Sequence, residues 1–447
     1  MEKPAEELAR IYGNQRWIIA TQAAVSAKQI CRRLTEWGSD VLVVASNEGT
    51  GDLPDAPIFY TGSKGSSALG SIREFYASVE SPSAAVRQAV DRFDPSGNAR
   101  VIAEPHATAM TMLGRATFGV RRPTWSAWED KMRVDQLWDD IDIARSPFRI
   151  VPIEDARAAA DDLATELGTV WAADNTDGWH GGSELVSWVS GPDRYHDVLD
   201  WLGQRTRVVR VMPFLEGLPC SIHGWVTATG VAVFLPVEIL ILRRIDQTGF
   251  EYAGVATVWD APTPVKESMR ELSRKVGTYL AREVGYLGPY GVDGILTPDG
   301  FRPTELNPRM SAGAGVQLGV VDVPLGLLMR AEIEGLVQVD HEWLEEIAIG
   351  QRKPAFHFGK MVSKEVRDTM WVGLDESGNV VEAGSAEDSI GKITAGPAAT
   401  GSYVTGEFQL EKLRPGAPVG AQVAASLNLA NGKWRLGLPE LAAAPVL

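Results

Sequence analysis

Short apolar runs alternate with amphipathic segments over the first hundred residues. RWIIAT (16–21) and DVLVVAS (40–46) are runs of the kind found in strands buried on both faces of a sheet. Between them, segment 26–38 has apolar residues at helical spacing and ends in a glycine, a common helix cap. VRQAVDRF and RVIAEP then repeat the helix–strand order. The pattern predicts a parallel, doubly wound α/β unit over about residues 10–120.

A proline-containing linker, RRPTWSAWED (121–130), leads into a region of mixed pattern. IEDARAAADDLATELG predicts a helix, and strands are predicted at 207–214, 220–228 and 231–242. The last hundred residues show strand-like patches punctuated by turn residues. The expected fold class is α/β and α+β in three parts: a Rossmann-like α/β domain at 1–120, an α+β domain at 121–340 and a small β-rich domain at 341–447.

Composition and charge exclude several classes of protein. The chain has 447 residues, of which 45% are hydrophobic and 23% charged, as in ordinary soluble proteins. The formal net charge of −15 argues against a non-specific nucleic-acid binder, which needs a basic face. No apolar run is long enough to cross a bilayer, the acidic N-terminus does not resemble a signal peptide, and two cysteines make no disulfide framework. We expect a cytoplasmic protein without nucleic-acid or membrane partners.

Three other features bear on possible binding sites, and two of them allow more than one interpretation. The turn after the first predicted strand, TQAAVSAK, lacks the G-x-G-x-x-G fingerprint, which argues against a dinucleotide site. GSKGSSALG (62–70) is either a phosphate-cradling loop or, as we favour, a flexible connector. Glu238 in LPVEIL is either an inward functional group or a solvent-facing strand position.

The segment VDGILTPDGFRPTELNPR predicts a hairpin rich in oxygen ligands. TPDG is a turn signal, and a three-residue Pro-Asp-Gly loop makes Thr297 pair with Phe301. Counted outward from there, Asp293 lies directly opposite Glu305, and Asn307 shares the face of Glu305. A slip of one residue would move Asp293 to the other face.

Two opposed carboxylates destabilise a sheet unless something offsets their repulsion. A solvated face or a shared proton would do so, and so would a divalent cation. Asp293, Glu305 and Asn307 offer the hard oxygen ligands that Mg²⁺ takes, with water and substrate phosphates completing its shell. Zinc is disfavoured, since the six histidines are scattered and no cysteine pair is present. The magnesium site is the favoured interpretation.

Arg309 lies two residues beyond Asn307. An arginine beside a magnesium–phosphate site can stabilise charge on a transferring phosphoryl group. The alternative is a surface arginine paired with an acid.

The hairpin resembles the metal-binding signature of the ATP-grasp superfamily, in which an acid precedes a hairpin and E-x-N-P-R follows it. Further landmarks occur in the expected order and extend the resemblance over about residues 121–330: EDKMRVDQLW (129–138), TDGWHGGSELVSW (176–188) and RVMPFLEG (210–217). The resemblance implies an ATP-grasp catalytic domain at 121–340, preceded by a pre-ATP-grasp domain, with ATP and Mg²⁺ as cofactors.

The resemblance also assigns roles to single residues. Lys131 would contact ATP, and Arg309 would be catalytic. The loop closing over the phosphates would contain Gly181, Gly182 and Ser183. The linker holding adenine through its backbone would contain Met212, Phe214 and Leu215, followed by Glu216 as the acid that contacts the nucleotide. Without the resemblance, Lys131 is equally well a helix-surface lysine, and the two glycines equally well a tight turn.

More narrowly, the three-part layout and the WHGG loop resemble the pheganomycin-type peptide ligases. These join a small amino-acid-derived acid to the amino end of a peptide. The implied reaction activates a carboxylate as an acyl phosphate and passes it to an amine, with release of ADP and phosphate. The implied partners are a small carboxylic acid and an amine or peptide, and family habit suggests a homodimer. A ligase or carboxylase acting on a non-peptide metabolite and a catalytically inactive nucleotide-binding regulator are the alternatives.

Two positions depart from the ATP-grasp pattern. Many members carry a second phosphate-binding lysine in a V-V-K-P strand, whereas TVWAADN (169–175) has none. Lys131, Arg243 or Arg244 would then carry more of the phosphate charge. The usual ribose-contacting acid falls near Leu218–Pro219, so Glu216 is its expected substitute.

Overall fold

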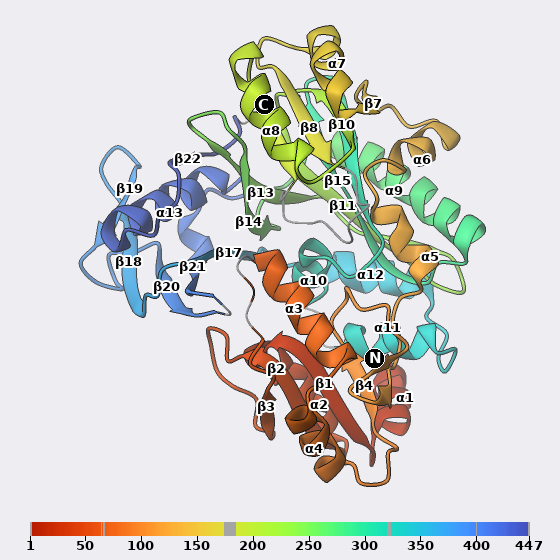
Figure 1. Ribbon diagram of the computed structural model, residues 1–447. Coiled ribbons are helices and arrows are strands. Elements are labelled where there is room, and N and C mark those ends of the chain that lie inside the picture. Colours follow the sequence, from red (N-terminus) through yellow and green to blue (C-terminus); the bar gives the residue numbers. More distant parts are fainter. Residues whose placement is uncertain are drawn as a thin grey trace.

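The computed structural model describes residues 2–63, 65, 68–173, 185–319, 323–398 and 400–445. Its elements form an N-terminal α/β unit, a small four-stranded sheet and a large antiparallel sheet (Figure 1). Among the described residues, no helix is both long and apolar enough to span a membrane.

The N-terminal unit is the parallel sheet that the apolar runs predict. Its strands lie in the order β3-β2-β1-β4, and every pairing is parallel. The strands are β1 (Arg16–Ala23), β2 (Asp40–Asn47), β3 (Ile58–Tyr60) and β4 (Arg100–Ala103), and the helices are α1 (Glu2–Tyr12), α2 (Lys28–Glu36), α3 (Ala68–Glu80) and α4 (Ala84–Phe93). The expected connector at 62–70 is wrong for its last three residues, because α3 begins at Ala68. Phe75 and Val79 of α3 pack in the core of this unit, which the glycine-rich start of the segment does not indicate.

The small sheet lies between the N-terminal unit and the large sheet in sequence. It is antiparallel with the order β7-β10-β8-β9. Its strands are β7 (Arg149–Pro152), β8 (Thr169–Ala173), β9 (Val186–Val189) and β10 (Val208–Pro213), and its helices are α7 (Ala156–Leu163) and α8 (Tyr195–Gly203). The helices α5 (Pro123–Ser126) and α6 (Val134–Asp140) precede it in the chain and pack in a core of the large sheet. Residues of α7 and α8 pack with the strands in one hydrophobic core.

The large sheet joins the centre of the chain to its C-terminal part. Its main path is β16-β15-β11-β13-β14-β17-β21-β20-β18-β19, with β12 on β11 and β22 on β13. Its strands are β11 (Leu218–Val226), β12 (Val231–Val233), β13 (Val237–Arg244), β14 (Phe250–Ala256), β15 (Gly288–Thr297), β16 (Gly300–Asn307), β17 (Phe356–Val362), β18 (Asp368–Leu374), β19 (Val380–Ala383), β20 (Gly391–Pro397), β21 (Ser402–Phe408) and β22 (Leu441–Ala442). The single strand predicted at 231–242 is wrong: Pro236 lies in the break between β12 and β13, in keeping with the missing N–H of proline.

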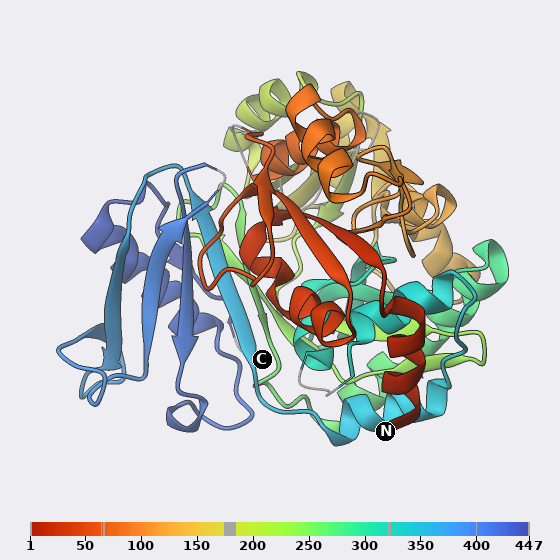
Figure 2. The same ribbon diagram turned by 90° about the horizontal axis from the view of Figure 1, so that it is seen from below.

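The helices that follow β14 in the described chain are α9 (Thr263–Val284), α10 (Ala312–Leu318), α11 (Leu325–Ile333), α12 (His341–Gly350) and α13 (Gly420–Trp434). The C-terminal part is β-rich, and α13 covers one face of its strands (Figure 2). The pairing of β14 with β17 carries the sheet across residue 340 without a break. The divisions at residues 120 and 340 remain predictions.

Candidate functional site

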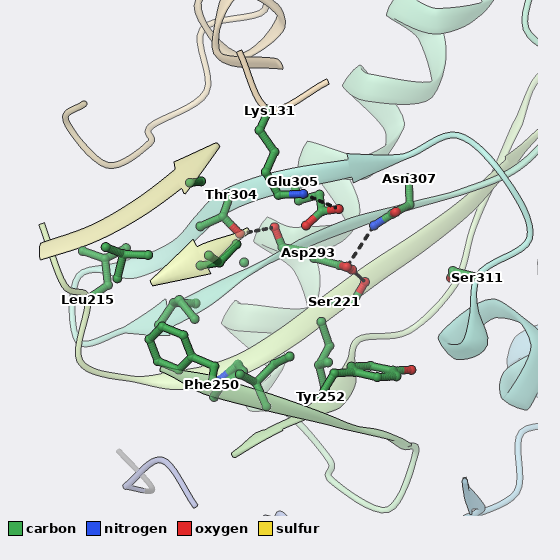
Figure 3. A pocket seen from close by; sticks show the side chains of 18 of the residues that line it. Lys131, Leu215, Ser221, Phe250, Tyr252, Asp293, Thr304, Glu305, Asn307 and Ser311 are labelled. Carbon is green, nitrogen blue, oxygen red and sulfur yellow. Dashed lines mark hydrogen bonds and ion pairs between the residues drawn. The ribbon is translucent and has the colours of Figure 1, made fainter. Parts of the chain in front are cut away.

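A cavity of about 490 Å³ lies between the small sheet and the large sheet. Alternate residues of β8 and β10 line one wall, and residues of β11 and β13 to β16 line the other. Figure 3 shows that Asp293, Glu305 and Asn307 gather at one end with Lys131 above them, while Leu215 and Phe250 lie toward the other end. The cavity therefore has a charged end and a largely apolar end.

The hairpin brings Asp293 and Glu305 into the predicted pairing by a different route. Thr297 pairs with Gly300 rather than with Phe301, so the predicted three-residue loop is wrong. A bulge between Asp293 and Gly294 then shifts the register, and Asp293 is paired with Glu305 as predicted.

The bulge is formed on β16. Thr304 is its additional residue, and its hydroxyl donates to the Asp293 carbonyl oxygen at 3.2 Å. The bulge compensates for the shorter loop, and this places both carboxylates on one side of the hairpin.

Asp293 is held from two sides within the cavity wall. The Ser221 hydroxyl donates to Asp293 Oδ1 at 2.6 Å, and the Asn307 amide donates to Oδ2 at 2.9 Å. Burial and then the facing Glu305 raise the pKa of Asp293 to about 6, although the Ser221 hydrogen bond opposes them. Burial and Glu305 therefore make the ionised form of Asp293 less favourable here than it is in water, and Arg309 and Lys131 oppose this effect.

Lys131 supplies part of this opposing positive charge. It lies in the turn before α6 rather than on a helix, and its ammonium is 3.2 Å from Glu305 Oε1. The two side chains are 15% and 27% exposed, so the pair is partly shielded from water. This position makes Lys131 a neighbour of the predicted metal ligands as well as a predicted ATP contact.

Arg309 is neither free nor at the surface. Its Nε donates to Glu129 Oε1 at 2.8 Å and its Nη2 donates to Asn307 Oδ1 at 2.8 Å. Arg121 shares Glu129 through an ion pair of 2.7 Å. The alternative of a surface arginine paired with an acid is wrong about the surface, because Arg309 lines the cavity, although Arg309 does pair with the acid Glu129.

The donor set fits a magnesium ion bound jointly by protein and phosphates. Among residues 2–63, 65, 68–173, 185–319, 323–398 and 400–445 there is no group of three or more His, Cys, Asp and Glu side chains suited to a metal. Mg²⁺ does not require such a cage, since one or two carboxylates, water and phosphates suffice. Asp293 and Glu305 supply these carboxylates. Asn307 would have to turn its amide to present its oxygen to the ion, since Oδ1 accepts from Arg309 and the amide nitrogen donates to Asp293.

The opposite end of the cavity is formed by the predicted linker and by β13 and β14. Met212, Phe214 and Leu215 line it, together with the apolar residues Ile239, Ile241 and Val255. Glu216 is 41% exposed at its side chain and accepts from Arg243, whose guanidinium lies 5.0 Å from the Phe214 ring centre. The lining suits a flat heteroaromatic group with a polar group at its edge.

Some predicted positions are not brought together by the described structure. Gly181, Gly182 and Ser183 lie outside the described residues. Arg244 is not in the cavity wall; it pairs with Glu251.

Sequence reasoning missed several cavity residues: Arg210, Ser221, His223, Phe250 and Tyr252. Ser221 and His223 alternate along a predicted strand, so their shared face could have been noticed. Burial lowers the pKa of His223 to about 3, which keeps it neutral.

The sequence matches no family model and no curated protein. Solved structures match in fold. The biotin carboxylase domain of Hydrogenobacter thermophilus 2-oxoglutarate carboxylase, solved with MgADP, ADP and bicarbonate, is 13% identical over 87% of this chain and 85% of that chain, with a TM-score of 0.55. Biotin carboxylase from Campylobacter jejuni, solved as a β,γ-ATP complex, is 11% identical over 89% and 88%, with a TM-score of 0.54. An ADP complex of N5-carboxyaminoimidazole ribonucleotide synthetase is 10% identical over 94% and 98%, with a TM-score of 0.50. The chain therefore has the three-domain ATP-grasp fold.

Proposed function

We propose that this chain is an ATP-dependent ligase that joins a carboxylate to an amine and releases ADP and phosphate. One observation carries the proposal: Asp293 and Glu305 oppose each other at one end of the cavity, with Lys131 and Arg309 beside them. This arrangement suits a magnesium–triphosphate group better than a buried structural ion pair, because it leaves two carboxylates in mutual repulsion.

The residues present fit both ATP and Mg²⁺. Asp293, Glu305 and Asn307 would hold the ion, which when bound neutralises charge on the phosphates. The apolar end near Phe214 and Ile241 would hold the adenine. The Glu216 carboxylate is not in the cavity wall, but it pairs with Arg243, which is. The ADP and ATP complexes among the solved structures of this fold support the same ligand class.

The chain's residues would act on charge and position rather than as nucleophiles. Transfer of the γ-phosphoryl group of ATP to a carboxylate oxygen breaks the β,γ P–O bond, and ADP leaves with that electron pair. Arg309 would stabilise the charge on the transferring group and then on the tetrahedral adduct formed by the attacking amine. Expulsion of phosphate and loss of the amine proton leave the amide. Gly181, Gly182 and Ser183 would exclude water from the acyl phosphate.

The amine substrate is an amino acid or a peptide in this proposal. The support is the three-part layout and the WHGG sequence, which resemble the pheganomycin-type peptide ligases. The acid would be a small amino-acid derivative.

Mass spectrometry of products tests the proposal most directly. The protein is incubated with Mg-ATP, candidate acids, amino acids and short peptides, and amide products are sought together with ADP. A new amide that depends on ATP is the expected result. ATP binding without ADP formation across a broad panel would instead indicate a nucleotide-binding regulator.

A carboxylase or a ligase for a non-peptide metabolite is the second candidate. It is favoured by the fold comparisons, whose matches include biotin carboxylases, one of them solved with bicarbonate. Incorporation of ¹⁴C-bicarbonate into an acid-stable product, without amide formation, would select it over the peptide ligase.

A further inference from the structure

The charged end of the cavity contains a buried guanidinium that the proposed function does not yet use. Arg210 lies on β10, with its side chain only 2% exposed, yet it forms part of the cavity wall. Its Nη1 donates to the Thr304 carbonyl oxygen at 3.2 Å, one residue from Glu305. The guanidinium is therefore next to the predicted magnesium ligands.

Arg210 also lies across from the stretch TVWAADN (169–175), which lacks the phosphate-binding lysine of many ATP-grasp members. Ala172 on β8 is its direct partner in the antiparallel register, and both residues line the cavity. Side chains directly opposite each other share a face, with Cβ atoms roughly 5 Å apart. A cation at 210 thus reaches nearly the same space as a cation at 172.

Asp135 on α6 holds Arg210 in place. Its Oδ1 accepts from Nη2 at 2.7 Å, and its Oδ2 is 2.6 Å from Nε. Burial raises the pKa of Asp135 and lowers that of Arg210, so both groups are poorly solvated. A buried ion pair is weak evidence for stability. This pair lies at the wall of the cavity, where its guanidinium can meet a ligand.

The other basic groups in the described cavity wall are less well placed for this role. Lys131 already pairs with Glu305, and Arg309 is bound to Glu129 and Asn307. Arg243 is too far along its strand. Val237 pairs with Ser221, which in turn pairs with Asp293, and Arg243 lies six residues beyond Val237 on β13, roughly 20 Å along the strand. His106 is neutral, because burial and then Arg309 and Arg121 lower its pKa to about 2.

We propose that Arg210, oriented by Asp135, binds the phosphate chain of the nucleotide and supplies the positive charge that β8, which has no lysine, does not. A desolvated guanidinium binds phosphate oxygens strongly through charge-assisted hydrogen bonds. The inference rests on the proposed function, since it requires ATP in this cavity.

The test measures binding by calorimetry with two probes, Mg-ATP and adenosine, which lacks phosphates. The variant is Asp135→Asn/Arg210→Met in the full chain, which removes both buried charges together. Mg-ATP affinity should fall by about 10- to 100-fold, the range expected for hydrogen bonds to charged groups, and adenosine affinity should not change. Adding Ala172→Lys to this variant should restore at least tenfold of the lost Mg-ATP affinity, which a purely structural role for Arg210 does not predict.

Controls separate the outcomes. Arg244→Met removes an ion-paired arginine outside the cavity and should leave both affinities unchanged. Unchanged Mg-ATP affinity in the double variant, or an equal fall for adenosine, overturns the role of Arg210. Wild-type protein that binds no Mg-ATP overturns this inference and the proposed function together, whereas tight binding without any ligation product overturns the proposed function alone. If the double variant does not fold, Arg210→Lys preserves the pair with Asp135; it should weaken Mg-ATP but not adenosine, and equal Mg-ATP affinity overturns the inference.

Discussion

Glu238 connects strand β13 to the start of helix α13, and we predict that its titration makes the stability of the protein depend on pH. The side chain is 2% exposed, and its carboxylate accepts backbone N–H groups of Val419 at 2.7 Å and Gly420 at 2.9 Å, where α13 begins. Burial raises its pKa from 4.5 to about 7, against the effect of these two hydrogen bonds. Such a rise corresponds to roughly 3 kcal/mol of folding free energy.

The direction of the pH effect follows from which state holds the proton. Between pH 4.5 and about 7 the folded carboxyl is protonated while the unfolded one is ionised. The folded state binds more protons in this window, so the free energy of unfolding falls as the pH rises through it. Glu238→Gln keeps a neutral side chain at every pH and removes this contribution. From pH 4.5 to 7.5 the wild type should therefore lose roughly 3 kcal/mol relative to the variant.

Denaturant unfolding at a series of pH values, followed by circular dichroism, measures this difference. Comparing two curves at each pH cancels the other titrating groups. Glu411→Gln, at an exposed position in the C-terminal part, serves as the matched control and should run parallel to the wild type. Parallel curves for wild type and Glu238→Gln would refute the reasoning, because Glu238 would then titrate alike in the folded and unfolded states.

The remaining predictions concern the charged end of the cavity. Glu305→Gln should lower Mg²⁺-dependent ADP release by about 100-fold or more, as expected for a metal ligand. The control Asp299→Asn, at the exposed hairpin tip, should leave ADP release unchanged. Unchanged turnover of Glu305→Gln contradicts the metal assignment. Arg309→Ala should lower kcat by about 100-fold with a much smaller change in KM for ATP, and the reverse pattern would make Arg309 a ground-state anchor. Ser221→Ala removes a 2.6 Å hydrogen bond that lowers the pKa of Asp293, so the acidic limb of the rate profile should move up by about 0.5 to 1 pH unit; an unmoved limb would show that Asp293 does not control it.

The N-terminal sheet could be predicted because its strands are continuous apolar runs buried on both faces. β1, β2 and β4 each coincide with such a run. β12 and β13 were predicted as one strand, because hydrophobicity alone does not mark where a proline ends pairing. The hydrophobic pattern predicted strands that are uniformly apolar. It failed where a single residue, such as Pro236, decides where strand pairing ends.

The hairpin shows a correct pairing reached through a wrong turn. With a two-residue loop, Asp293 pairs with Glu305 only if one strand contains one extra, unpaired residue. The prediction instead counted the glycine of TPDG as a third loop residue, which gives the same pairing. The structure places the extra residue at Thr304 instead. A bulge is stabilised by neighbouring strands and by the hydrogen bond of that threonine, and no local motif announces it.

Contacts between distant segments were outside the reach of sequence patterns. Arg210 and Asp135 are far apart along the chain, and each has an ordinary local setting on a strand or a helix. Glu238 illustrates the same limit, since both open alternatives fitted an acid within an apolar run. The backbone of residues 419 and 420 decides between them, and the carboxylate is inward but serves α13 rather than the cavity.

We expect the cations at the charged end of the cavity to change partners when a metal ion binds. Lys131 pairs with Glu305, and the pKa of Asp293 is raised by its burial and then by Glu305. A divalent cation bound by both carboxylates would favour ionised Asp293 and compete with the ammonium for Glu305. Lys131 would then be released toward the phosphates, with Arg210 and Arg309 already fixed by Asp135 and Glu129. We therefore expect Mg²⁺ and nucleotide to bind cooperatively, and Lys131→Met to reduce that cooperativity more than it reduces the affinity for Mg²⁺ alone. Equal losses in both would place Lys131 as a simple partner of Glu305.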